Sequence, residues 1–172
     1  MPIYKFSPNL ASAKERLETF VAREAVLEDL LDRARKIESG AQHCILIGPR
    51  GIGKTHLLLL LADRIAADES LASQWQAIRF AEEEYSVTSL AELLLRIIEL
   101  MPGDRPENMG RDVDLALAHI LDFSVTSGKR LLLLMDNIHL YFSQFPDADI
   151  GRLRDILMSK SAFLIVGAAP SY

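Results

Sequence analysis

One stretch decides the fold expected for this chain: Gly48, Pro49, Arg50, Gly51, Ile52, Gly53, Lys54, Thr55. It fits the phosphate-binding loop pattern G-x-x-x-x-G-K-[ST] at every fixed position. A loop that wraps a polyphosphate turns its backbone N–H groups inward, which needs backbone angles that glycine adopts at little cost. We expect Gly48, Gly51 and Gly53 to supply those angles.

The end of the loop carries side chains with defined tasks in this pattern. A helix opens there, and its N-terminal N–H groups and dipole face the anion. The Lys54 ammonium is expected to reach the β and γ phosphates as a catalytic group, and the Thr55 hydroxyl to bind Mg²⁺. The predicted nucleotide-binding residues are therefore Gly48, Pro49, Arg50, Gly51, Ile52, Gly53, Lys54, Thr55 and His56.

The sequence on either side of the loop favours this interpretation over a chance glycine-rich turn. The apolar run 44–47 is short enough for a buried strand, and 56–67 is an apolar, helix-forming stretch. Strand, loop and helix thus follow one another in the order that the motif requires.

Composition sets the class of protein. The 172 residues are 49% hydrophobic and 25% charged, as in one globular domain with a real core. The formal charge of −5 does not indicate nucleic-acid binding. The single cysteine, Cys44, allows no intramolecular disulfide, and no signal layout or membrane-spanning apolar run is seen. We therefore expect a cytoplasmic protein with no membrane partner.

The remaining elements alternate between helical and strand patterns. We expect helices over 22–39, 90–101, 112–125 and 150–158, strands over 76–80 and 162–167, and a loop over 68–74. Ser89 with Glu92 is a capping-box signature. Strands that alternate with helices predict an α/β fold with a parallel sheet covered on both faces.

A second informative stretch runs from Arg130 to Asn137. Four leucines followed by a methionine are apolar on both faces, as a central parallel strand must be. The strand delivers Asp136 at its C-terminal end, where ligands bind in open α/β sheets, so Asp136 is expected to hold Mg²⁺. This is a Walker B pattern; the alternative is an ordinary Asp-Asn turn after a core strand.

These motifs resemble those of AAA+ ATPases, near the STAND and origin-recognition branches. The resemblance rests on F-V-A-R-E from Phe20, G-P-R-G-I-G-K-T-H-L-L from Gly48, L-L-L-L-M-D-N from Leu131 and F-L-I-V-G-A-A-P-S from Phe163. It covers residues 20–172 and leaves 1–19 as a lead-in segment. It implies a three-layer αβα P-loop NTPase core with a mostly parallel sheet, in which the strand after Walker B lies between it and the phosphate-loop strand.

The same resemblance implies three further roles. The box at 20–24 touches adenine, which points to Val21 and Ala22. Ser171 falls where the sensor-1 residue is expected. Arg152 and Arg154 are candidate trans-acting arginine fingers if the protein assembles in rings, although arginine on a surface helix is commonplace.

One departure from the family pattern concerns catalysis. Most AAA+ ATPases have a glutamate straight after the Walker B aspartate, whereas this chain has Asn137. An amide cannot act as a general base, so hydrolysis is expected to be slow unless another carboxylate serves. Glu83, in the run 82–84 after the second strand, is the candidate, and a solvated acidic cap before a helix is the alternative.

The other departure is length. A fifth strand, a helical lid and a sensor-2 arginine find no residues after Tyr172, so we expect the N-terminal part of a larger ATPase, or else a minimal module.

The function expected from these observations is Mg²⁺-ATP binding and hydrolysis, with homo-oligomers or C-terminal effector domains as further partners. Adenine is favoured by the resemblance alone, and no guanine-specific N-K-x-D run is present. One alternative is a nucleotide-dependent switch that binds ATP or ADP and hardly hydrolyses it. Another is a small-molecule kinase, although the chain has no D-G-[FY]-P-R lid pattern.

Overall fold

Four parallel strands form the centre of the structure, a computed structural model that describes residues 10–18, 23–36, 43–81, 86–104, 106, 109–159 and 163–171. The strands are β1 (Cys44–Gly48), β2 (Trp75–Arg79), β3 (Arg130–Met135) and β4 (Phe163–Pro170), in the spatial order β1-β4-β3-β2. β4 therefore lies between the phosphate-loop strand and the Walker B strand, as predicted.

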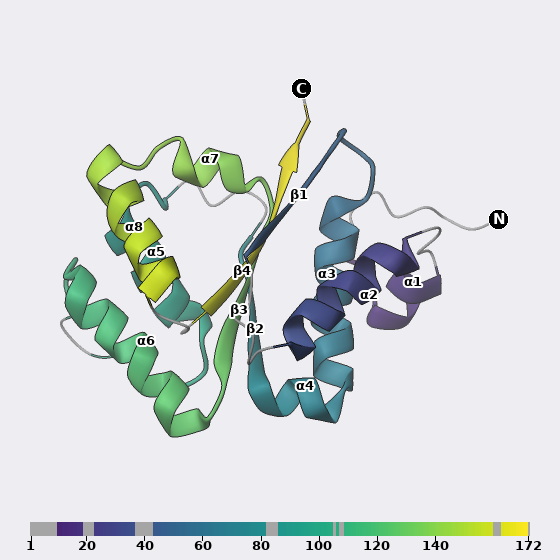
Figure 1. Ribbon diagram of the computed structural model, residues 1–172, viewed down its shortest axis with the longest axis horizontal. Helices are drawn as coiled ribbons and strands as arrows, with labels where there is room; N and C mark the ends of the chain where they lie inside the picture. The colour runs from purple at the N-terminus through teal and green to yellow at the C-terminus, as the bar shows by residue number, and fades with distance from the viewer. Residues whose placement is uncertain are drawn as a thin grey trace.

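Helices cover both faces of this sheet (Figure 1). One side carries α1 (Ala13–Glu18), α2 (Glu24–Arg35), α3 (Lys54–Ala67) and α4 (Glu69–Gln74). The other carries α5 (Leu90–Leu100), α6 (Val113–Ser127), α7 (Ile138–Phe142) and α8 (Asp147–Ser159). This is the three-layer αβα architecture expected of a P-loop NTPase core.

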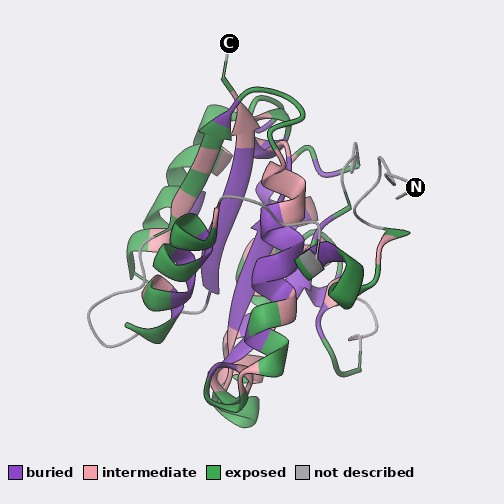
Figure 2. Ribbon diagram, turned by 90° about the vertical axis from the view of Figure 1, so that its right-hand side faces the viewer, coloured by how far each residue is buried: buried purple, intermediate pink, exposed green. Residues whose placement is uncertain are grey.

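The two central strands explain why a core forms on each face. Successive side chains of a strand point to opposite faces. Along β3, Leu131 and Leu133 join the cluster under α5 and α8, while Leu132 and Leu134 join the cluster under α2 and α3. The sheet interior is accordingly buried along its length (Figure 2).

β1 departs from the expected buried strand. Ile45 and Ile47 are 52% and 71% exposed, while Cys44 and Leu46 pack against the α2–α3 cluster. The reason is that β1 is an edge of the described sheet, with only one face covered by helices. Burial raises the pKa of the Cys44 thiol, in keeping with an inert role.

Local hydrogen bonds account for the other differences. The loop expected over 68–74 is wrong, because Asp68 accepts from the N–H groups of Ser70 and Leu71 at 3.0 and 3.2 Å and starts α4. Ser89 caps α5 through the Glu92 N–H at 3.3 Å, but the Glu92 carboxylate accepts from Thr88. The short helix α7 was not predicted.

Helix α2 has the predicted apolar stripe, with Leu27, Leu30, Leu31 and Ala34 buried. The ends of the helix predicted over 22–39 lie outside the described residues. In the part of the chain that the structure describes, no helix is long and apolar enough to cross a membrane.

Candidate nucleotide site

The phosphate loop joins the end of β1 to the start of α3. Gly51 and Gly53 have φ of +76° and +87°, the left-handed conformation expected of them. The expectation for Gly48 is wrong, because Gly48 has no positive φ and ends a regular strand. A Cβ at Gly48 would stand 3.3 Å from Ile52 Cγ2, a tight contact that the Ile52 side chain would have to relieve by a few tenths of an ångström.

Lys54, the first residue of α3, folds back over the loop. Its ammonium donates to the carbonyl oxygens of Gly48 at 2.7 Å and Pro49 at 2.9 Å. The charge is therefore held at the mouth of the loop, beside the N-terminal N–H groups of α3, and both attract an anion.

Thr55 connects the phosphate loop to the Walker B pattern. The Thr55 hydroxyl donates to the carboxylate of Asp136, although 81 positions separate them in sequence. Asp136 is only 7% exposed at the end of β3, and its other oxygen accepts from the Asn137 N–H at 2.9 Å. The fold thus brings together the two residues predicted to hold a metal ion.

The oxygens of Thr55 and Asp136 suit a hard divalent cation such as Mg²⁺, which prefers oxygen ligands and keeps several waters. Among the residues that the structure describes, no group of three or more His, Cys, Asp or Glu side chains could hold a metal ion. A cavity of about 340 Å³ opens beside this pair, and Arg79 and Arg96 also line it. Sequence reasoning did not single out these two arginines, although the first ends the strand beside Walker B.

Asn137 follows Asp136 with φ 48° and ψ 39°. It is the one non-glycine residue of the described ranges with a positive φ. Its side chain makes no capping hydrogen bond to α7. Asparagine tolerates this conformation better than most residues do.

The N-terminal helices are fastened to the phosphate-loop helix. The Arg16 guanidinium forms a forked pair with the Asp63 carboxylate, with bonds of 2.8 and 2.9 Å. His56 Nε2 lies 2.7 Å from the Arg16 carbonyl oxygen. A Cβ on Gly53 would stand 3.1 Å from the Arg23 guanidinium, so the box at 20–24 ends beside the loop. Val21 and Ala22 lie outside the described residues, and the nucleotide contact of His56 stays a prediction.

The end of β4 also reaches the loop. The Ser171 N–H donates to the Gly48 carbonyl at 3.1 Å, the same oxygen that Lys54 contacts. The predicted sensor-1 position is therefore next to the phosphate loop, while its sensing role stays a prediction.

Two other candidate residues do not join this group. Arg152 pairs with Asp114 of α6 across the helical layer, and Arg154 is exposed on α8. Their role as arginine fingers is untested. Glu83 lies outside the described residues.

Comparison with known proteins identifies the family. The sequence model described as AAA ATPase domain matches residues 19–166. The chain belongs to this family. No curated protein matches this chain significantly.

Solved structures with the same fold are distant in sequence. The Aeropyrum pernix ORC2 protein, solved as ADPNP-ADP complexes, has a TM-score of 0.70 at 18% identity; the match covers 88% of this chain and 42% of that chain. Cdc6p from Pyrobaculum aerophilum has a TM-score of 0.54 at 17% identity; the match covers 94% of this chain and 43% of that chain. PCH-2 from C. elegans has a TM-score of 0.56 at 15% identity; the match covers 88% of this chain and 39% of that chain. This chain thus spans about two fifths of the length of these proteins, and the likeness shows the fold.

Proposed function

We propose that this AAA domain binds Mg²⁺-ATP and hydrolyses it slowly, as the nucleotide-binding part of a larger cytoplasmic ATPase. The observation that carries the proposal is the contact between Thr55 and Asp136, beside a loop whose mouth is held by Lys54. A buried carboxylate, a hydroxyl and an ammonium at one loop are the side chains that a Mg²⁺-triphosphate requires.

Each residue of the group has a distinct role in the proposal. Bound Mg²⁺ would neutralise charge on the β and γ phosphates. Lys54 would exchange its two loop carbonyls for phosphate oxygens, and Thr55 would turn its oxygen from Asp136 to the cation. The glycine-rich loop would point its N–H groups at the phosphates, because Gly51 and Gly53 already hold the required backbone angles.

Activation of water is the weak step of this site. The Asn137 amide can orient a water molecule but cannot accept its proton at neutral pH. We propose Glu83 as the general base, on the ground that it follows β2 in the sequence and that β2 lies directly beside β3.

A nucleotide-dependent switch is the second candidate, and Asn137 is the observation that favours it. A domain that holds ATP without an efficient base would change state mainly by exchange of ATP for ADP. Partner subunits or effector domains would then respond to the bound nucleotide.

The first experiment measures Mg²⁺-ATP affinity by calorimetry. Lys54→Ala should weaken binding at least tenfold, because the phosphates lose their contact with the positively charged Lys54 ammonium. Lys129→Ala removes the same charge from a position outside the loop and should bind ATP as wild type does. Equal affinity of Lys54→Ala and wild type would show that the phosphate-loop assignment is wrong.

The second experiment measures steady-state phosphate release. If wild type turns over and Glu83→Gln abolishes release while affinity is kept, Glu83 is the base and the domain is an ATPase. If wild type binds ATP but releases no phosphate, the switch is the function.

A further inference from the structure

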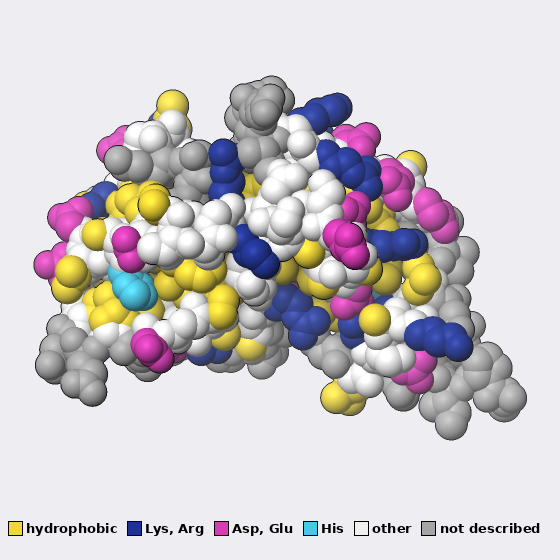
Figure 3. All heavy atoms as spheres, turned by 90° about the horizontal axis from the view of Figure 1, so that it is seen from below, with side chains coloured by type: hydrophobic (Ala, Val, Ile, Leu, Met, Phe, Trp, Pro, Cys, Tyr) yellow, Lys and Arg dark blue, Asp and Glu magenta, His cyan; other side chains and the backbone are white. Residues whose placement is uncertain are grey.

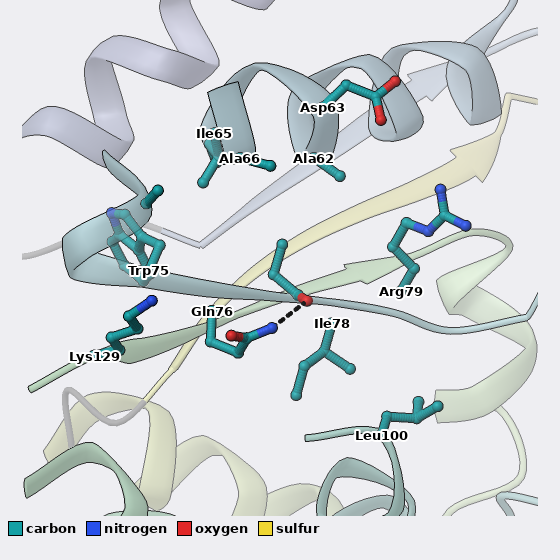
Figure 4. A pocket seen from close by; sticks show the side chains of 12 residues that line it. Ala62, Asp63, Ile65, Ala66, Trp75, Gln76, Ile78, Arg79, Leu100 and Lys129 are labelled. Carbon is teal, nitrogen blue, oxygen red and sulfur yellow. Dashed lines mark hydrogen bonds between the residues drawn. The ribbon is translucent and has the colours of Figure 1, made fainter. Parts of the chain in front are cut away.

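A groove of about 510 Å³ follows strand β2 on the side away from β3. β2 is an edge of the described sheet, so this side of the strand has no neighbour there. Ala62 and Ala66 of α3 lie above the strand, and Leu100 lies below it (Figure 4). Most of the wall residues are small or apolar, and the strand runs between them. The one acidic residue of the lining, Asp63, is neutralised by its forked pair with Arg16.

The backbone of β2 presents hydrogen-bonding groups to this groove. The Phe80 N–H donates to Leu134 of β3 at 3.1 Å, so it points into the sheet. Because backbone direction alternates along a strand, the N–H and C=O groups of Ala77 and Arg79 point outward. The Gln76 side chain reaches round and donates to the outward Ala77 carbonyl at 3.3 Å, in agreement with that direction. The Ala77 N–H and both Arg79 backbone groups therefore face the groove.

A cation stands at each end of the groove (Figure 4). Arg79 ends β2, while Lys129 precedes Arg130, which pairs with Trp75 at the start of β2. At about 3.3 Å per residue, the strand between them spans about 13 Å. Within the described part of the chain, neither the Arg79 nor the Lys129 side chain forms a hydrogen bond or ion pair.

We propose that the edge of β2 binds an extended acidic segment of a partner protein as an added strand. The backbone of that segment bonds to Ala77 and Arg79, and carboxylates about four residues apart reach Arg79 and Lys129. The residues between them are small and apolar, because the alanines of α3 leave shallow room. This is strand addition, in which main-chain bonds give affinity and alternate side chains give specificity.

Charge argues against a second copy of this chain in the same place. Two β2 strands paired antiparallel would bring Arg79 of one copy toward the Lys129 end of the other. Like charges that face each other across strands are destabilising, and edge cations of this kind discourage self-pairing. An acidic segment converts the same two cations into attractions.

The test uses the full chain and a fluorescein-labelled peptide, Gly-Glu-Ala-Val-Ala-Glu-Gly, followed by fluorescence anisotropy. Wild type should bind it, and a peptide with lysine for both glutamates should bind at least tenfold more weakly. Arg79→Glu and Lys129→Glu should each weaken binding of the acidic peptide at least tenfold. Arg64→Glu makes the same charge change on the exposed side of α3, outside the groove, and should leave binding within twofold of wild type.

A backbone measurement on wild type separates strand addition from loose charge attraction. Amide hydrogen exchange of Ala77 and Arg79 should slow when the acidic peptide is bound, because their outward N–H groups gain acceptors. Absence of peptide binding, binding without slower exchange at Ala77 and Arg79, or full binding by both charge variants would each overturn the proposal. Dimerisation of the chain that excludes the peptide would overturn it in favour of a second copy.

Discussion

Asn137 is the residue on which the proposed rate of ATP hydrolysis depends. Its backbone is in the left-handed conformation, and it directly follows Asp136, the residue proposed to hold Mg²⁺. Family resemblance implies a glutamate here, yet a glutamate in this backbone conformation costs about 1 kcal/mol relative to a right-handed one. The position therefore couples catalysis to stability.

Replacing Asn137 tests both sides of that coupling. Asn137→Glu should raise phosphate release several-fold by supplying a carboxylate, while the free energy of unfolding falls by about 1 kcal/mol. Asn137→Gly suits a positive φ, so its stability should stay within about 0.5 kcal/mol of wild type and its turnover should not rise. Urea denaturation and phosphate release measure the two effects. Unchanged turnover of Asn137→Glu would show that the missing carboxylate does not limit hydrolysis.

At the scale of the element, helix α7 is fixed by a glycine on β4. A Cβ on Gly167 would stand 2.6 Å from Ile138 Cδ1 and 3.0 Å from Ile138 Cγ2. Ile138 opens α7 directly after Asn137, so this contact sets how closely the Asp136–Asn137 turn approaches the sheet.

Gly167→Ala should therefore destabilise the fold by about 1–3 kcal/mol, because a buried side chain and a strand must move apart. Gly151→Ala is the matched control in α8. No atom lies within 4 Å of its added Cβ, and alanine favours a helix, so stability should rise by about 0.5–1 kcal/mol. In urea denaturation, Gly167→Ala with Ile138→Ala should cost less than the sum of the single changes. An additive result would mean that the contact does not limit packing.

His43 joins strands β1 and β4 at their N-terminal ends. Its Nδ1 accepts from the Ile165 N–H at 3.0 Å, which requires an unprotonated nitrogen. Burial lowers the pKa of His43, and a bond to the Leu157 backbone offsets part of that shift. Protonation therefore favours the unfolded chain, where histidine has a pKa of about 6.5.

Stability should accordingly fall as pH drops from about 6.5 toward the lower folded-state pKa of His43. His43→Gln retains a side-chain acceptor without titrating, so its unfolding free energy should change less over this range. Urea denaturation at pH 5.0 and 7.5 makes the comparison. An identical pH dependence of the two proteins would assign the effect to other groups.

At the scale of the whole molecule, the two sides of the sheet differ in their surfaces. On the face seen in Figure 3, apolar side chains cover larger areas on the α6 side, and charged side chains of both signs gather on the α4 side. The exposed isoleucines of β1 add an apolar strip at a sheet edge. Unpaired backbone beside apolar side chains is a site of edge-to-edge association.

Ile47→Lys should reduce concentration-dependent association, measured by light scattering, and leave the unfolding free energy within about 0.5 kcal/mol of wild type. Val125→Lys adds the same charge at an 81% exposed position of α6 and should reduce association less, because a helix has no open edge. A loss of more than about 1 kcal/mol in Ile47→Lys would mean that this face is covered in solution.

The sequence by itself determined the motifs and the order of the elements. The 48–55 loop, the apolar strand before Asp136 and the Ser89 cap follow from residue types a few positions apart. Backbone conformation and helix capping are local, so a short window of sequence contains their cause. The family resemblance could be found from the sequence for the same reason, because it rests on those short motifs.

Only the tertiary structure decided what depends on distant segments. The space that Gly48 leaves for Ile52, the use of His56 and Asp63 to hold Arg16, and the close approach of Ile138 to Gly167 are contacts that no local pattern encodes. The exposure of β1 and the groove along β2 follow from which strands lie at the sheet edges. Burial is a property of the assembled layers, and a strand with the same sequence is core in the middle of a sheet and surface at its edge.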